Sequence, residues 1–134
     1  MDQKHIKFAV VGLGRIGKRH VDIINVHSMA RLVACCDLLT SKELNFDPGV
    51  PLYDTIEALF EVHNPDVVCI CTPNGLHVEH ATIALEHNAH VVCEKPLGLN
   101  KSSCESLIYT ALKHNKRIFC VMQNRYSPPS KCIK

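Results

Sequence analysis

The sequence predicts a single α/β domain with a doubly wound, parallel sheet of about six strands, and three observations lead to that prediction. Short apolar segments rich in Val, Ile and Cys recur along the chain, as is typical of strands buried on both faces of a parallel sheet. Segments with the apolar spacing of helices separate them. The chain has 134 residues, 46% hydrophobic and 21% charged, which suits one globular domain and excludes a disordered or fibrous protein.

Six segments are expected to be strands of this sheet. In chain order they are residues 6–11 (IKFAVV), 31–36 (RLVACC), 50–53 (VPLY), 66–71 (DVVCIC), 90–93 (HVVC) and 117–122 (RIFCVM). The third is the weakest of the six. Right-handed crossovers between parallel strands then favour the strand order 3-2-1-4-5-6.

Four intervals between the strands carry a helical pattern. Their apolar or helix-facing positions are Ile16, Ile23, Ile24 and His27; Ile56, Leu59, Phe60 and His63; Val78, Ala81, Ala84 and Leu85; and Cys104, Leu107, Ile108 and Ala111. Asp54 with Glu57, and Ser102 with Glu105, resemble N-terminal capping pairs. Residues 38–49 (LLTSKELNFDPG) show no convincing helix and are expected to form a surface loop.

The chain is close to electrically neutral, with a formal net charge of +2 at pH 7. It has no run or stripe of Lys and Arg, so neither nucleic acid nor a membrane surface is an expected partner. No apolar run approaches the ~20 residues that cross a bilayer. The first residues lead straight into a strand-like segment without the apolar core of a signal peptide. We therefore expect a soluble, cytoplasmic protein.

The eight cysteines do not suggest a disulfide framework. Six of them lie inside apolar segments, where a free thiol behaves as a small hydrophobic group, and we expect them to be buried and reduced: Cys35, Cys36, Cys69, Cys71, Cys93 and Cys120. Cys69-x-Cys71 and His77-x-x-His80 are too few ligands in unsuitable contexts for zinc, so no metal site is expected.

The first strand runs directly into residues 12–17 (GLGRIG), a G-x-G-x-x-G motif that opens a helical pattern. In a dinucleotide-binding turn, Gly12 permits the tight turn, Gly14 lets the pyrophosphate approach the backbone, and Gly17 lets the helix pack on the sheet. The N–H groups at the start of the helix would face the phosphates. An ordinary structural turn is the alternative, but the strand before the motif and the helix after it favour dinucleotide binding.

Asp37 closes the second strand, about 20 residues after Gly17, where dinucleotide-binding domains carry an acidic residue. Its carboxylate can accept hydrogen bonds from the adenosine ribose hydroxyls and would repel a 2′-phosphate. Leu38 and Leu39 follow, so no adjacent Arg offsets that repulsion. The sequence therefore predicts NAD rather than NADP. A solvated acid at a strand end is the alternative for Asp37.

Polar residues also follow the fourth and fifth strands, as residues 72–77 (TPNGLH) and Glu94-Lys95-Pro96. Ligands of open α/β sheets lie outside the carboxyl ends of the strands, so both loops are expected to face the cofactor. A lysine held near the nicotinamide can stabilise a developing alkoxide or act as a base. A surface cation without a catalytic role is the alternative for Lys95.

Four segments, in this order, resemble the glucose-fructose oxidoreductase / inositol dehydrogenase / MocA (Gfo/Idh/MocA) family of NAD(P)-dependent oxidoreductases. They are the glycine motif, residues 72–81 (TPNGLHVEHA), 93–97 (CEKPL) and 123–128 (QNRYSP). EKP after a strand, downstream of TPN-x-x-H, is more specific than the glycine motif alone. The resemblance covers essentially the whole chain, and residues 122–126 (MQNRY) are similar to the UDP-N-acetylglucosaminuronate 3-dehydrogenases.

The resemblance implies a role for each matching position. Lys95 matches the family's catalytic lysine, which hydrogen-bonds the reacting sugar hydroxyl and assists its deprotonation, and Glu94 matches the residue beside the nicotinamide ribose. For His77, a helix-start histidine held by local hydrogen bonds is the alternative. The other implied positions are Gly12, Gly14, Arg15, Ile16 and Asp37 for the pyrophosphate and adenosine ribose; Thr72, Pro73, Asn74 and His77 for the nicotinamide side; and Asn124, Arg125 and Tyr126 for the substrate.

The resemblance also implies a second α/β domain that carries most substrate contacts and a histidine working with the lysine. The chain matches only the first domain. We therefore expect residues 1–124 to form the dinucleotide-binding Rossmann domain and residues 125–134 to begin a crossover to a C-terminal domain. The expected function is the NAD-binding half of an oxidoreductase that moves a hydride between nicotinamide and a sugar or nucleotide-sugar hydroxyl carbon, inactive alone.

A stand-alone NAD-binding or interaction module without catalysis is the alternative function. Such a module has no need of Lys95, so the intact EKP motif favours descent from an enzyme. Exposed apolar surface over residues 118–122 would favour association, including a homo-oligomer.

Overall fold

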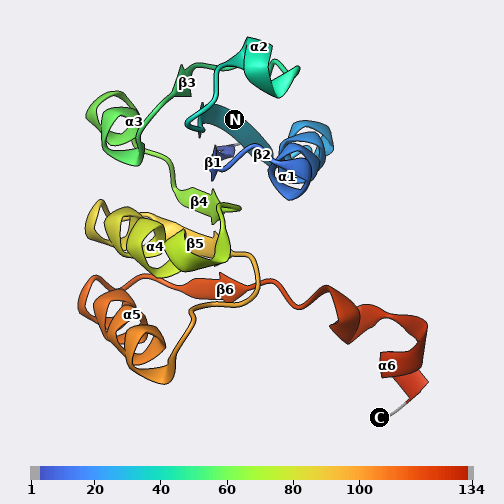
Figure 1. Cartoon of the computed structure of the whole chain (residues 1–134), viewed down its shortest axis with the longest axis vertical. Helices are drawn as coiled ribbons and strands as arrows, with labels where there is room; N and C mark the ends of the chain where they lie inside the picture. Colours follow the sequence, from blue (N-terminus) through green and yellow to red (C-terminus); the bar gives the residue numbers. More distant parts are fainter. Residues whose placement is uncertain (1–3, 133–134) are drawn as a thin grey trace.

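The strands form because their side chains alternate between the two faces of one sheet, and both faces find apolar partners. In the computed structural model, which describes residues 4–132, the parallel strands follow the order β3-β2-β1-β4-β5-β6 (Figure 1). The doubly wound fold and strand order predicted from the sequence are confirmed. Residues 1–3 and 133–134 of the predicted domain ranges lie outside the described residues. The strands are β1 (Ile6–Val11), β2 (Ala30–Cys36), β3 (Leu52–Tyr53), β4 (Val67–Ile70), β5 (His90–Cys93) and β6 (Ile118–Cys120).

β1 lies at the centre of the sheet and contributes to both core layers. Val10 is in register with Cys35 of β2 and Cys69 of β4, and these three residues belong to one layer. Ala9 and Val11 belong to the layer on the opposite face. Because all strands run in parallel, their carboxyl ends meet at one edge of the sheet. The loops that were predicted to face the cofactor begin at this edge.

Helices cover both faces of the sheet. Figure 1 shows α1 (Arg15–Val26) on one face and α3 (Ile56–Val62), α4 (His77–Glu86) and α5 (Lys101–Lys113) on the other. The predicted apolar positions of these last three helices supply most of their buried residues, namely Ile56, Leu59, Phe60, Ala81, Ala84, Leu85, Leu107 and Ala111. The short elements are α2 (Ser41–Leu44), α6 (Pro128–Cys132) and the 3₁₀ turns η1 (Asn74–Leu76) and η2 (Gln123–Tyr126).

Of the positions predicted to mark helix α1, only Ile24 is buried. The buried residues of this helix are Gly17, Val21 and Ile24, whereas Ile16 and Ile23 are 42% and 55% exposed. The phase of the helix is set by Gly17, whose lack of a side chain lets it lie against the preceding turn. The spacing of apolar residues does not reveal a contact made by a glycine. The predicted buried face of α1 was therefore wrong in part.

The predicted helix caps are displaced by one or two residues. Thr55, not Asp54, caps α3, and Asn100, not Ser102, caps α5. In each case the side-chain oxygen accepts from the backbone N–H three residues further on, at 3.2 Å and 2.8 Å respectively. An extended backbone at the capping residue permits this bond, and the sequence spacing of acidic residues does not reveal which residue is extended.

The predicted loop over residues 38–49 contains one helical turn, so the prediction of a loop without a helix was wrong. Glu43 N–H donates to Thr40 Oγ1, and Thr40 N–H donates to a Glu43 carboxylate oxygen at 2.8 Å. This reciprocal capping box stabilises α2. A helix of one turn has no apolar repeat from which it could be predicted.

Burial of the cysteines departs from the prediction at two positions. Cys120 is exposed because it lies on β6, the edge strand of the sheet, and Cys71 is half-buried. All eight cysteines are free thiols. The remaining cysteines of the predicted set are buried as expected: Cys35, Cys36, Cys69 and Cys93.

β6 leaves apolar surface uncovered at the edge of the sheet. Phe119 is 53% exposed and Met122 is 52% exposed. Beyond β6 the chain continues through η2 into α6, which extends away from the sheet (Figure 1). Over residues 4–132, no helix is both long and apolar enough to traverse a bilayer.

Replacing Asn100 with Ala is expected to lower the free energy of unfolding by about 1 kcal/mol, because the Ser103 N–H at the start of α5 loses its acceptor. Ser102→Ala in the first turn is the matched control and should change it by less than about 0.5 kcal/mol. Urea unfolding followed by circular dichroism measures both. Equal losses in the two variants would contradict the assignment of the cap.

Candidate functional site

Two glycines let the turn after β1 lie directly against β4 and α1. Gly12 has a φ of +91°, and a Cβ at this position would lie 2.6 Å from the carbonyl oxygen of Cys71. A Cβ on Gly17 would lie 1.8 Å from the carbonyl oxygen of Gly12. A Cβ on Gly14 would have no atom within 4 Å. Gly12 and Gly17 therefore hold the turn closed, and Gly14 leaves its backbone open to a ligand.

The start of α1 is built to receive an anion. Gly14 is the N-terminal cap, and within residues 4–132 no side chain accepts a hydrogen bond from the first N–H groups of this helix. Arg15 and Ile16, in its first turn, are exposed. Unpaired N–H groups and the positive end of the helix dipole bind phosphate groups well.

Asp37 follows β2 and fixes the same turn from the other side. Its Oδ2 accepts from Leu13 N–H at 2.7 Å, and its Oδ1 accepts from Leu39 N–H at 2.9 Å. A carboxylate offers about four lone-pair positions, so it can still accept from ligand hydroxyls. The side chain is therefore both a support of the glycine turn and a polar group that lines the cavity described next.

A cavity of about 700 Å³ lies along the carboxyl ends of β1 to β4. The prediction from the sequence did not include several of the residues that line it. Asp54, Thr55 and Glu57 follow β3, where the strand-end argument applied to the other strands would have found them. Glu79 and His80 lie on α4. The predicted residues that line it are Gly12, Gly14, Arg15, Ile16, Asp37, Thr72 and Pro73.

A second cavity of about 300 Å³ adjoins the first. Ile16, Cys71 and Thr72 line both, so the two cavities follow one edge of the sheet. The smaller cavity brings together the loops predicted after the fourth and fifth strands. Its other lining residues are Asn74, His77, Glu94, Lys95 and Gln123.

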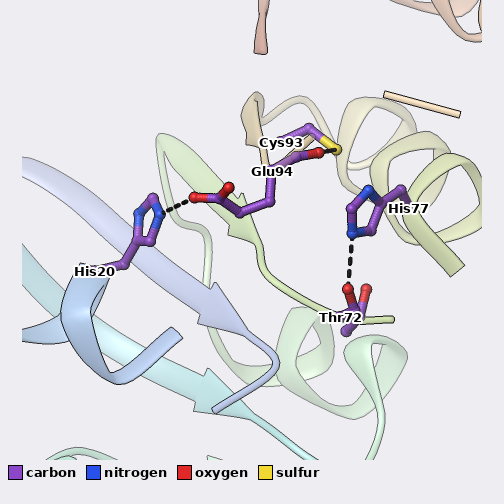
Figure 2. Close-up of polar contacts among 5 residues, drawn as sticks. All are labelled: His20, Thr72, His77, Cys93 and Glu94. Carbon is purple, nitrogen blue, oxygen red and sulfur yellow. Dashed lines mark hydrogen bonds and ion pairs between the residues drawn. The ribbon is translucent and has the colours of Figure 1, made fainter. Parts of the chain in front are cut away.

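His77 ties these two loops to each other. The ring is 1% exposed, with Nδ1 2.7 Å from the carbonyl oxygen of Pro96 and Nε2 2.7 Å from that of Thr72 (Figure 2 shows the Thr72 contact). A neutral imidazole carries one N–H, so both contacts are hydrogen bonds only when the ring holds two protons. These bonds fit the alternative of a histidine engaged locally, and direct cofactor contact by His77 stays a prediction.

Glu94 has a partner that sequence reasoning missed. Its Oε1 lies 2.9 Å from Nε2 of His20, across 74 residues of sequence (Figure 2). His20 stands three residues after Gly17 in α1. One signal was present in the sequence, because this spacing puts His20 on the same side of the helix as Gly17 and Ile24.

Burial favours the neutral forms of two titratable side chains that line the cavities, Cys71 and His80. Burial raises the pKa of the Cys71 thiol well above its usual value, and nearby thiols and Glu94 add to the effect. Cys71 is therefore a packing group rather than a thiolate nucleophile. Burial also lowers the pKa of His80, with Glu79 acting in the opposite direction. His80 Nδ1 lies 3.1 Å from the Thr72 hydroxyl and helps to hold that loop.

The remaining predicted residues lie at the rim or outside the cavities. Lys95 is exposed at the mouth of the smaller cavity. The substrate residues predicted on η2 are exposed and line neither cavity: Asn124, Arg125 and Tyr126. Their roles stay predictions. Among the described residues, no group of three or more His, Cys, Asp or Glu side chains is placed to hold a metal ion.

A parallel sheet whose first strand enters a G-x-G-x-x-G turn, with an acid after the second strand, defines a Rossmann domain of the dinucleotide-binding class. Residues 6–122 match the oxidoreductase family with an NAD-binding Rossmann fold. The chain belongs to this family, named Gfo/Idh/MocA, and the matched residues are its NAD-binding domain.

Dehydrogenases that are named for different substrates are similar to this chain. D-glucoside 3-dehydrogenase of Escherichia coli is 30% identical over 131 residues, which are 95% of this chain and 37% of that protein. Two solved structures superimpose on it closely. WlbA dehydrogenase from Bordetella pertussis, in complex with NADH and UDP-GlcNAcA, has a TM-score of 0.88 at 29% identity and covers 98% of this chain and 41% of its own. Scyllo-inositol dehydrogenase from Lactobacillus casei, with bound NAD(H) and scyllo-inositol, has a TM-score of 0.83 at 27% identity, with coverages of 97% and 40%.

The chain therefore spans about two fifths of the length of the relatives that it matches. The match falls on their cofactor-binding part. The family and its NAD-binding domain are established on this basis, and substrate and activity belong to the proposal below.

Gly17→Ala is expected to destabilise the fold by about 3 kcal/mol or more, because the new methyl group meets the Gly12 carbonyl oxygen and the backbone has to move. Gly14→Ala is the control, since a methyl group there enters open space, and it should cost less than about 1 kcal/mol. Thermal and urea unfolding without cofactor measure the difference. A Gly17→Ala variant as stable as Gly14→Ala would refute the proposed role of the close contact.

Proposed function

We propose that the chain binds NAD in an extended form along the carboxyl edge of its sheet, as the cofactor half of a sugar dehydrogenase. The observation that supports this most strongly is the pair of adjoining cavities, which share Ile16, Cys71 and Thr72 and pass the uncapped start of α1. In the proposal the adenosine half occupies the larger cavity and the nicotinamide half the smaller. The pyrophosphate lies at the backbone of Gly14, Arg15 and Ile16.

The charges of the larger cavity support NAD over NADP. Four carboxylates line it, namely Asp37, Asp54, Glu57 and Glu79. The Asp37 carboxylate accepts hydrogen bonds from the adenosine ribose hydroxyls in this proposal. A 2′-phosphate would bring at least one further negative charge into a cavity that is partly closed to water, where repulsion between like charges is weakly screened.

The smaller cavity carries the groups proposed for chemistry. When bound, NAD supplies the hydride acceptor. Lys95 then hydrogen-bonds the hydroxyl of a sugar or nucleotide sugar at the mouth of the cavity and assists removal of its proton. Glu94 accepts from the nicotinamide ribose. Asn74 and His77 shape the nicotinamide side, and Pro73, which lines the larger cavity, is proposed to contact the cofactor where the two cavities adjoin. The relatives named for glucoside, inositol and UDP-GlcNAcA support a polyhydroxylated substrate.

The substrate side is proposed to lie beyond these cavities. Asn124, Arg125 and Tyr126 contact the sugar or its phosphate, and residues 125–134 begin the connection to a substrate domain. We also propose that two copies of the chain associate through the apolar edge at Phe119. The proposed location of the protein is the cytoplasm. Exposure of Phe119 and Met122 supports a further surface packing against β6.

Calorimetric titration is expected to show NAD binding to the chain and NADP binding at least about tenfold more weakly. Asp37→Ala should weaken NAD about tenfold or more, since a charged acceptor is lost, and should narrow the gap between the two cofactors. Asp22→Ala, which removes an exposed carboxylate from α1, is the control for net charge and should change neither value. Equal affinity for NAD and NADP in the unaltered chain would contradict the cofactor assignment.

Dehydrogenase turnover by the 134 residues alone is expected to be negligible, because positioning of the substrate contributes several kcal/mol to catalysis and needs more surface than the two cavities offer. The assay follows NADH formation with inositol, a glucoside and a UDP-sugar, with Lys95→Ala as the blank. Steady NADH formation that depends on Lys95 would show that the chain is a complete enzyme. The alternative function, a stand-alone NAD-binding module, predicts that the chain binds the cofactor and that Lys95 has no catalytic role.

A further inference from the structure

The contact between His20 and Glu94 joins helix α1, which begins within the glycine motif, to the EKP segment that follows β5. His20 lies in α1, and Glu94 follows β5, yet Nε2 and Oε1 are 2.9 Å apart (Figure 2). The two side chains are only 19% and 15% exposed. A contact this shielded from water is screened less by solvent and salt than a pair of surface side chains.

The backbone of Glu94 is already fixed, so the contact acts on its side chain. Glu94 N–H donates to the carbonyl oxygen of Ile70 at 3.0 Å, which extends the pairing of β4 with β5. What remains free is the rotation of the carboxylate. In the part of the chain that the structure describes, His20 is the only side chain in hydrogen-bond or ion-pair contact with this carboxylate, and Lys95 is exposed and makes no such contact with it.

Glu94, whose carboxylate is held in this way, lines the smaller cavity together with Lys95 and Thr72. The contact with His20 uses Oε1, and within residues 4–132 no protein group is hydrogen-bonded to Oε2. Oε2 is thus available to a ligand hydroxyl in a direction that His20 determines.

We propose that His20 is a positioning residue of the nicotinamide side: it fixes the Glu94 carboxylate so that Oε2 meets the nicotinamide ribose. Because a carboxylate oxygen only accepts, the contact requires a proton on Nε2, which both the imidazolium and the neutral Nε2–H tautomer carry. This inference rests on the proposed binding of NAD and adds a residue of α1 to it. His20 lines neither cavity, so its effect on a ligand passes through Glu94.

Two amide variants of the chain separate positioning from general support. His20→Gln can keep an N–H donor near the place of Nε2, whereas His20→Asn is one methylene shorter and cannot reach Oε1. The expected result is that His20→Asn weakens NAD binding about tenfold and His20→Gln stays within about threefold of the unaltered chain. ADP, which lacks the nicotinamide riboside, should bind equally to all three proteins.

The comparison of NAD with ADP by calorimetry, with folding verified by circular dichroism, decides the inference. Unchanged NAD affinity in His20→Asn, or a parallel loss of ADP affinity, would overturn it, because neither outcome is an effect on the nicotinamide side. Adding Glu94→Gln to His20→Asn should cause little further loss of NAD affinity, and full additivity of the two changes would also overturn it. Absence of NAD binding by the unaltered chain would overturn the proposed function and this inference together.

Discussion

The close approach of three backbone segments at the first glycine turn is the constraint on which the rest of the site depends. Gly17 presses α1 onto the carbonyl of Gly12, and Gly12 presses the turn onto Cys71 at the end of β4. These contacts set the phase of α1, bring its uncapped start to the edge of the sheet, and place His20 within reach of Glu94. Cofactor site and core packing are thus two results of the same contacts.

The elements that the sequence predicted well are those whose signal is local and repeated. Strand order followed from the alternation of apolar segments with helical ones. Gly14 and Asp37 were predicted from the glycine motif and the spacing of the acid, and Glu94 from the rule that ligands meet strand ends. All three line the cavities, and their contacts with a cofactor stay predictions. The predicted starts of the helices were less accurate. Whether Asn100 or Ser102 caps α5 depends on which of the two residues has an extended backbone. Residues such as His20 and His80 enter through tertiary contacts, which spacing in the sequence shows only weakly.

Two histidines contact the residues that line the smaller cavity. The ring nitrogens of His77 lie 2.7 Å from the carbonyl oxygens of Thr72 and Pro96. His20 contacts the side chain of Glu94, and Figure 2 shows this contact and the one between His77 and Thr72. His77 connects the two loops that line the smaller cavity, and in our proposal His20 orients the Glu94 carboxylate there. Lys95 is left exposed at the mouth, which suits a residue that meets a substrate arriving from another surface. A rigid cofactor site beside an open substrate side is the arrangement that the proposed function requires.

The most direct test of the account is a two-dimensional amide NMR titration of the chain with NAD, compared with ADP. The account predicts that both ligands shift the amides of Gly14, Ile16 and Leu39, and that NAD alone also shifts those of Thr72, Glu94 and Lys95. Shifts by NAD that stop at the residues affected by ADP, or that fall outside both cavities, would contradict an extended cofactor along the edge of the sheet.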